Sequence, residues 1–192
     1  MLELVLGSSS PFRKELLDKL GLPFSTAAPD ADETRHKGEK PTDLVMRLSE
    51  AKAKAVADSH PEALIIGSDQ VACVDEQILG KPDNRENAIA QLGAMAGKTI
   101  TFYTGLCLLN SKTNRSQVLC EPFHVHFRQL SNAQIERYVD REQPFNCAGS
   151  FKSEGLGITL FRRLEGDDPN TLVGLPLIRL VEMLDKEGVV LP

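Results

Sequence analysis

The stretch LGSSSPFRKELL, residues 6–17, predicts a strand that runs directly into a helix. Residues 2–6 form a short apolar run typical of a buried strand, and Ser10 followed by Pro11 is typical of a helix start. The junction is rich in glycine and serine, whose backbone N–H groups and hydroxyls can face an anion, and Arg13 adds a positive charge. The stretch therefore predicts a candidate anion site, although a plain turn capped by Ser10 explains the same residues.

The rest of the chain mixes helical and strand patterns. From periodicity and turn residues we expect a loop over 22–41, a helix over 42–57, a strand over 63–67, a hairpin around Asp75 and Glu76, a helix from Asp83 to Ala96, two long antiparallel strands flanking a turn at 111–115, a helix capped by Ser131, a strand over 156–164 and a final helix from Pro176 to Leu184. No repeat or linker interrupts the chain. These patterns predict one α/β domain (mixed α+β) over residues 1–192, built on a mixed β-sheet.

Composition excludes several classes of protein. The net charge of −5 gives no basic field for nucleic acid or an anionic membrane. Apolar runs stay well short of the roughly 18 residues of a membrane span, and the N-terminus lacks the basic start of a signal peptide. The cysteines (Cys73, Cys107, Cys120 and Cys147) are widely spaced, which argues against a zinc site and indicates reduced thiols. We therefore expect a cytoplasmic protein that binds neither nucleic acid nor membrane.

Lys52 stands out on the helix expected over 42–57. The apolar positions of this helix form one stripe, made of Leu44, Leu48, Ala51, Ala55 and Val56. Lys52 falls inside the stripe, whereas Lys54 falls on the opposite face. Lys52 could run its stem along apolar surface to water, or it could deliver an ammonium into a cleft.

Two further charged residues lie at expected turns. Asp69 follows the apolar run 64–66, and the carboxyl ends of strands are where open α/β sheets bind ligands. A carboxylate there can hold a metal or accept a proton, or it can simply cap a turn. Lys81 stands between a glycine and a proline. The constrained backbone could hold the Lys81 ammonium in one direction toward a ligand, or Lys81 could be a solvated lysine of the hairpin. With Arg13 and Lys52, these residues suit a phosphate ester and a metal ion.

Seven fragments, in order along the chain, resemble motifs of one family. They are SSSPFR (8–13), DADET (30–34), EAKA (50–53), GSDQ (67–70), GKP (80–82), AGSFKSEG (148–155) and VGLPL (173–177). Each fragment alone is a weak signal, but their order is specific. The chain resembles the Maf nucleotide pyrophosphatases.

The resemblance implies a fold and an activity. The family has an elongated mixed sheet flanked by helices, with a cleft between two lobes, similar to inosine triphosphate pyrophosphatases. It hydrolyses nucleoside triphosphates to the monophosphate and pyrophosphate with a divalent cation, for which we expect Mg²⁺ or Mn²⁺. A small-molecule nucleotide is then the expected partner, and a homodimer is expected because family members are often dimeric.

Roles carry over from the matching motifs. The resemblance implies that Asp69 is the general base and that Glu33 is a candidate for the metal or the water. It also implies a set of residues that hold the triphosphate, namely Ser8, Arg13, Lys52 and Lys81.

Departures from the pyrimidine-acting members concern the base. Those members have Arg, Thr and Gln where this chain has Phe12, Gln70 and Glu154, and the DKAG segment is altered at Asn146 and Cys147. A Glu154 carboxylate can accept two hydrogen bonds from the N1–H and 2-amino group of guanine. Phe12 offers an aromatic face to a cationic ring, which N7-methylation of guanine creates. Alternatively, Phe12 packs under its loop and Glu154 pairs with Arg162 or Arg163.

The variant pattern resembles the 7-methyl-GTP pyrophosphatase branch of the family. We therefore expect a metal-dependent hydrolase acting on 7-methyl-GTP. Two alternatives stay open: a dTTP and UTP pyrophosphatase, as in other branches, and a non-catalytic nucleotide sensor linked to cell division.

Overall fold

The computed structural model describes residues 2–75 and 77–192. The strands are β1 (Glu3–Leu6), β2 (Ser25–Thr26), β3 (Ala63–Val74), β4 (Gln77–Leu79), β5 (Thr99–Asn110), β6 (Arg115–Phe127) and β7 (Phe161–Glu165). The α-helices are α1 (Pro11–Asp18), α2 (Pro41–Ala55), α3 (Arg85–Met95), α4 (Asn132–Glu142), α5 (Asn170–Val173) and α6 (Leu177–Lys186). Short 3₁₀ helices are η1 (Ala57–Ser59), η2 (Ala148–Ser150) and η3 (Leu156–Leu160).

The strands form one mixed sheet in the order β2-β1-β3-β5-β6-β7, with β4 paired to β3. β1 pairs in parallel with β2 and β3, whereas β4 and β7 pair antiparallel with β3 and β6. This arrangement confirms the predicted α/β class with a mixed sheet flanked by helices. Within the described residues, no helix has the length and apolar character needed to cross a membrane.

The chain forms two compact units, and β3, β5 and β6 each contribute residues to both. Unit 1 contains Met1–Gln70, Tyr103–Glu121 and Asp168–Pro192, and unit 2 contains Val71–Phe102 and Pro122–Asp167.

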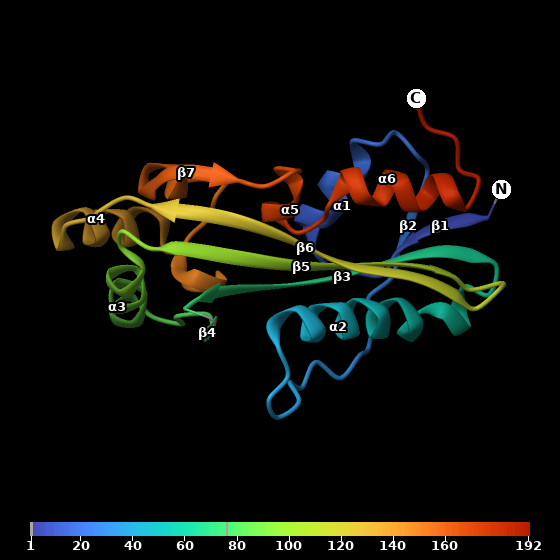
Figure 1. Ribbon diagram of the computed structural model, residues 1–192, viewed down its shortest axis with the longest axis horizontal. Coiled ribbons are helices and arrows are strands. Elements are labelled where there is room, and N and C mark those ends of the chain that lie inside the picture. Colours follow the sequence, from blue (N-terminus) through green and yellow to red (C-terminus); the bar gives the residue numbers. More distant parts are fainter. Residues whose placement is uncertain (1, 76) are drawn as a thin grey trace. The chain divides into compact units, whose positions relative to one another are not determined.

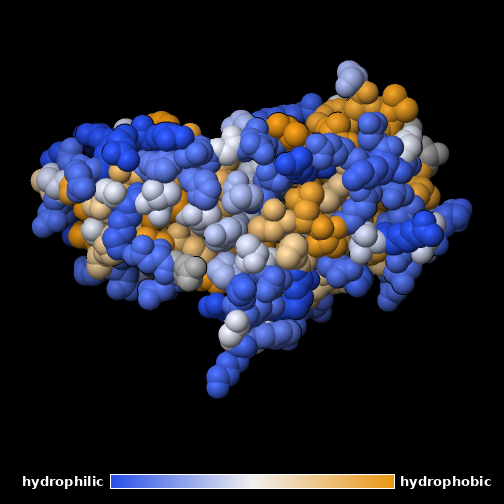
Figure 2. All heavy atoms as spheres, in the orientation of Figure 1, coloured by the Kyte–Doolittle hydropathy of each residue, from blue (hydrophilic) through white to orange (hydrophobic). Residues whose placement is uncertain are grey.

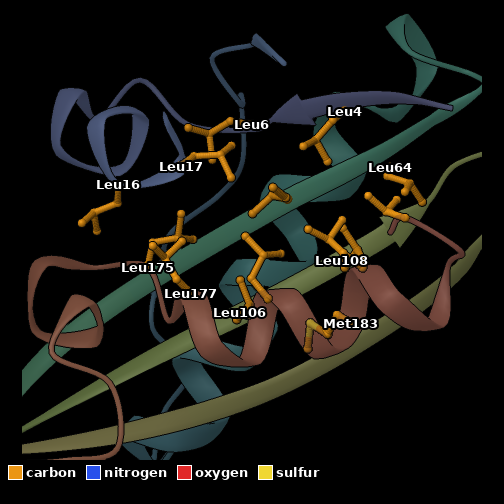
Figure 3. Packing of buried hydrophobic residues seen from close by; sticks show 14 residues of the cluster. Leu4, Leu6, Leu16, Leu17, Leu64, Leu106, Leu108, Leu175, Leu177 and Met183 are labelled. Atoms are coloured by element: carbon orange, nitrogen blue, oxygen red, sulfur yellow. The ribbon is translucent and has the colours of Figure 1, made fainter. Parts of the chain in front are cut away.

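Unit 1 is a three-layer α/β/α arrangement. Alternate strand residues point to opposite faces, so Leu4 and Leu6 of β1 join one core cluster and Val5 joins another. The first cluster includes Leu17 of α1 and Met183 of α6, as Figure 3 shows. The second packs against α2, which covers the other face of these strands (Figure 1). Strands buried on both faces are typical of parallel α/β structure.

Two glycines let α2 lie unusually close to the sheet. A Cβ placed on Gly67 of β3 would collide with the Ser49 carbonyl oxygen of α2, and one on Gly105 of β5 would collide with the Val45 carbonyl oxygen. Only hydrogen fits at these positions. The close approach brings the C-terminal half of α2, which contains Lys52, against β3.

Unit 2 has its own aromatic core. Phe127, Phe151 and Phe161 contact one another edge to face, with ring centroids 5.2–5.4 Å apart, and Phe102 contacts Phe151 at 5.5 Å. Helices α3 and α4 pack against each other in this unit. A capping box at Ser131 starts α4, as the sequence predicted.

Several boundaries differ from expectation. β3 continues to Val74, so Asp69 lies within a strand and the prediction of a strand end at Gly67 was wrong. The strand continues because its later residues, Ala72–Val74, pair with β4. The loop expected over 22–41 contains the two-residue β2, and the N-cap of α3 is Asn84 rather than Asp83.

The strand expected over 156–164 is also only partly correct. Residues 156–160 form η3, and only Phe161–Glu165 pair with β6. Gly157 packs too tightly on the Lys152 carbonyl to carry a side chain, and its N–H donates to that carbonyl at 3.0 Å. The expected hairpin between β3 and β4 is present, but its turn residue Glu76 lies outside the described residues.

Candidate active site

The N-terminus of α1 is built as the sequence predicted. Ser10 caps the helix by accepting from the Arg13 N–H at 3.4 Å, and Pro11 is the first helical residue. The buried Ser8 hydroxyl accepts from the Ser10 N–H at 3.2 Å and from Arg13 Nη1 at 3.5 Å. Two serine hydroxyls, the N-terminus of α1 and a guanidinium therefore lie together, which suits an anionic ligand.

Arg13 is positioned by the far end of the chain. Its Nε donates to the Gly174 carbonyl at 2.8 Å, and the Ser68 hydroxyl donates to the same oxygen at 3.0 Å. Gly174 adopts φ 123°, a conformation that favours glycine. Burial lowers the pKa of Arg13, while the charges of Asp69 and Glu33 oppose this. An arginine stays protonated through such a shift, so the site keeps a fixed positive charge.

The Lys52 side chain forms the centre of the site. Its Nζ lies 2.6 Å from Asp69 Oδ1 and 2.9 Å from Glu33 Oε1, and the residue is only 8% exposed. The ammonium therefore contacts two carboxylates instead of running out to bulk water. The apolar stripe differs slightly from expectation, since Ala55 is exposed and the buried face is centred on Val45, Ser49, Lys52 and Val56.

Asp69 is held from its backbone as well as its side chain. The Asp69 N–H donates to the Ser49 hydroxyl at 3.0 Å, and that hydroxyl donates to the Val45 carbonyl at 2.6 Å. Asp69 itself is nearly buried, at 9% exposure. A buried carboxylate beside an ammonium can exchange a proton with a bound water or bind a cation.

Gln70 is fixed by residues that sequence reasoning missed. Its Nε2 donates to Thr104 Oγ1 and to the Thr171 carbonyl, both at 2.8 Å. Thr104 in turn donates to the Thr171 carbonyl at 3.1 Å. No sequence motif marks Thr104 or Thr171, and Gly174 is marked only by the VGLPL fragment. Only the folded chain brings these residues next to Gln70 and Arg13.

The remaining predicted site residues are more exposed. Phe12 is 52% exposed, which does not match a ring packed under its loop. Lys81 and Glu154 belong to unit 2, where both are exposed. Within the part of the chain that the structure describes, Glu154 forms no ion pair with Arg162 or Arg163, and Arg163 pairs with Glu165 at 3.0 Å. The functions assigned to Lys81 and Glu154 stay predictions from the sequence.

A divalent cation would find oxygen ligands here. Among residues 2–75 and 77–192 there is no cluster of three or more His, Cys, Asp or Glu side chains that could hold a metal. Asp69 and Glu33 nevertheless both reach the Lys52 ammonium, which brings two carboxylates together. Mg²⁺ is usually held by one or two carboxylates together with substrate phosphates, so this pair fits such an ion.

The mixed sheet with helices on both faces of its parallel part defines an α/β protein. Its candidate anion site, at the start of α1, contains Ser8 and Arg13, and Lys52 contacts Asp69 and Glu33 in the same unit. The chain matches the Maf-like protein family over residues 3–187 and belongs to that family, which confirms the resemblance found in the sequence.

Similar proteins share almost the whole chain. A protein of Alcanivorax borkumensis named 7-methyl-GTP pyrophosphatase is 67% identical over 98% of this chain and 96% of its own length. A protein of the same name from Pseudomonas aeruginosa is 58% identical over the full length of both. The solved structure of the Staphylococcus aureus Ham1 protein has 13% identity, covers 96% of this chain and 99% of its own, and gives a TM-score of 0.55. The last comparison supports the fold alone.

Proposed function

We propose that this protein hydrolyses nucleoside triphosphates to the monophosphate and pyrophosphate, with 7-methyl-GTP as its main substrate. Family membership and the names of relatives up to 67% identical support the reaction and the substrate. The observation that carries the proposal is the Lys52–Asp69 contact of 2.6 Å beside Arg13 and the N-terminus of α1. The candidate base Asp69 thus lies near cationic groups that can bind phosphate, and hydrolysis of a phosphoanhydride requires both.

Each residue has a task in this reaction. The N-terminus of α1, with Ser8 and Arg13, binds phosphate oxygens, and Lys52 neutralises charge that develops there. A water oxygen forms a bond to phosphorus while the anhydride P–O bond breaks and pyrophosphate leaves. The water proton passes to the Asp69 carboxylate.

A divalent cation is part of the proposal. Glu33 would supply a ligand beside the substrate phosphates, and Mg²⁺ or Mn²⁺ would supply charge neutralisation at the phosphate oxygens. Cytoplasmic location and a homodimer also stay predictions from the sequence.

Release of pyrophosphate tests the proposal. Purified protein is mixed with 7-methyl-GTP, GTP, dTTP or UTP and Mg²⁺ or Mn²⁺, and both pyrophosphate and monophosphate are quantified. We expect stoichiometric release from 7-methyl-GTP, and a roughly 10²–10⁴-fold lower kcat for Asp69→Asn with binding retained. Binding without turnover in the wild type would favour the sensor, and a preference for dTTP or UTP would favour the pyrimidine enzyme.

A further inference from the structure

The loop over 27–40, between β2 and α2, brings Glu33 to the site without support from a helix or strand. The Glu33 side chain is 62% exposed and contacts Lys52 at 2.9 Å. The carboxylate side of this pair is exposed, and solvent screening weakens the attraction, so the contact alone holds the loop only weakly. The loop runs beside α2 in Figure 1, and its surface is hydrophilic in Figure 2. Further polar contacts at the end of the loop add to this one.

Glu39, at the end of this loop, makes those contacts. Arg47 of α2 donates from Nε to Glu39 Oε1 at 2.6 Å and from Nη2 to Oε2 at 2.9 Å. The His36 N–H also donates to Oε2, at 3.0 Å. The Glu39 side chain is only 9% exposed. The bonds from Arg47 lower the pKa of Glu39 to about 2, so the carboxylate stays charged near neutral pH.

Arg47 also reaches the residue next to Glu33. Its Nη2 donates to the Thr34 carbonyl at 3.0 Å, and the Thr34 N–H donates to Asp32 Oδ1 at 2.9 Å. One guanidinium thus holds both the end of the loop and the backbone adjoining Glu33. Lys52 follows five residues later on the same helix, so α2 fixes both partners of the Glu33–Lys52 contact.

We propose that Arg47 and Glu39 form a clamp that positions Glu33 against Lys52 and Asp69, and that this positioning is needed for turnover. The proposal rests on the nucleotide hydrolysis proposed above. Neither residue contacts the ammonium or the reacting atoms, so both are positioning residues.

Hydrogen exchange and kinetics test the clamp together. Glu39→Gln and Arg47→Met should each raise amide exchange over residues 32–39 by about tenfold or more and lower kcat/KM for 7-methyl-GTP by about tenfold. Arg85 and Asp140 supply the control because they form a similar two-bond pair, at 2.6 and 3.1 Å, in unit 2. Arg85→Met and Asp140→Asn should change neither quantity. Glu39→Gln keeps the shape of the side chain and decides the test if Arg47→Met does not fold.

A double variant separates positioning from a general loss of stability. If the clamp acts through Glu33, Arg47→Met should cost little further activity once Glu33 is already changed to Gln. Equal losses in the wild-type and Glu33→Gln backgrounds would overturn the proposal, as would unchanged exchange over 32–39. A wild type that releases no pyrophosphate would refute the proposed reaction instead, while the exchange result would still decide whether the clamp orders the loop.

Discussion

At the scale of single residues, the site depends on one lysine that has two tasks. Lys52 is buried, and the carboxylates of Asp69 and Glu33 compensate the charge of its ammonium. In the proposed reaction the same ammonium contacts phosphate. Breaking a buried ion pair from one side costs about 3–5 kcal/mol, because it leaves the other charge unsatisfied. At Lys52, stability and activity are therefore separated by comparing the single variant with one that also changes Asp69.

We predict that Lys52→Met lowers both stability and activity, because it keeps the stem and removes the charge. The loss should be about 3–5 kcal/mol in denaturant unfolding, with little turnover left. Lys52→Met combined with Asp69→Asn should recover most of the stability and none of the activity. Lys54→Met is the matched control, since Lys54 forms an exposed pair with Glu50 on the same helix. A stable, active Lys52→Met protein would refute the function given to Lys52.

The sequence predicted the charged residues of the candidate site more readily than the contacts that hold those residues in place. Asp69 and Lys52 were identified from apolar patterns and family motifs, although Asp69 lies within β3 rather than after it. The contact between Arg13 and the Gly174 carbonyl joins residues 161 positions apart, so no local pattern predicts it. Glu39 and Arg47 lie only eight residues apart, but their contact depends on how the loop folds back on α2.

At the scale of elements, the spacing between α2 and the sheet determines the site. Lys52 reaches Asp69 because Gly67 and Gly105 let the helix lie directly on β3 and β5. The sequence pattern predicted that the strand ends at Gly67. In the structure the strand continues, and Gly67 is the position at which the backbone of α2 lies against it. A glycine inside a strand often marks a site where another backbone approaches closely.

We predict that Gly67→Ala moves α2 away from β3. The added Cβ meets the Ser49 carbonyl and the Ala53 backbone nitrogen, so the protein should lose about 1–3 kcal/mol of stability. Turnover should fall as well, because the Lys52–Asp69 contact lengthens. Gly93→Ala on α3 is the control: nothing lies within 4 Å of its Cβ position, and a small gain in stability is expected. Full activity in Gly67→Ala would show that the close packing does not matter for the site.

At the scale of the whole molecule, the two units carry different parts of the predicted recognition. Unit 1 contains the predicted proton acceptor Asp69 and most of the residues predicted to bind phosphate, together with Phe12, and unit 2 contains Lys81 and Glu154. Charge-assisted hydrogen bonds to a Glu154 carboxylate are worth roughly 1.5–3 kcal/mol each, whereas a desolvated contact between a cation and an aromatic ring is worth about 2 kcal/mol. Guanine selection should therefore be the larger effect and methyl selection the smaller.

We predict that 7-methyl-GTP is preferred over GTP, and that both are preferred over dTTP and UTP, in kcat/KM. Phe12→Ala should remove a methyl preference of up to about 30-fold while sparing the choice of guanine, since about 2 kcal/mol corresponds to that ratio. Glu154→Gln should weaken the preference for guanine, spare the methyl preference and admit pyrimidines. The admission of pyrimidines should be clearest when it is combined with Gln70→Thr and Phe12→Arg. Glu165→Gln, which changes a carboxylate paired with Arg163, should alter neither preference. Equal hydrolysis of dTTP and 7-methyl-GTP by the wild type would refute the assignment of the base while leaving the pyrophosphatase reaction intact.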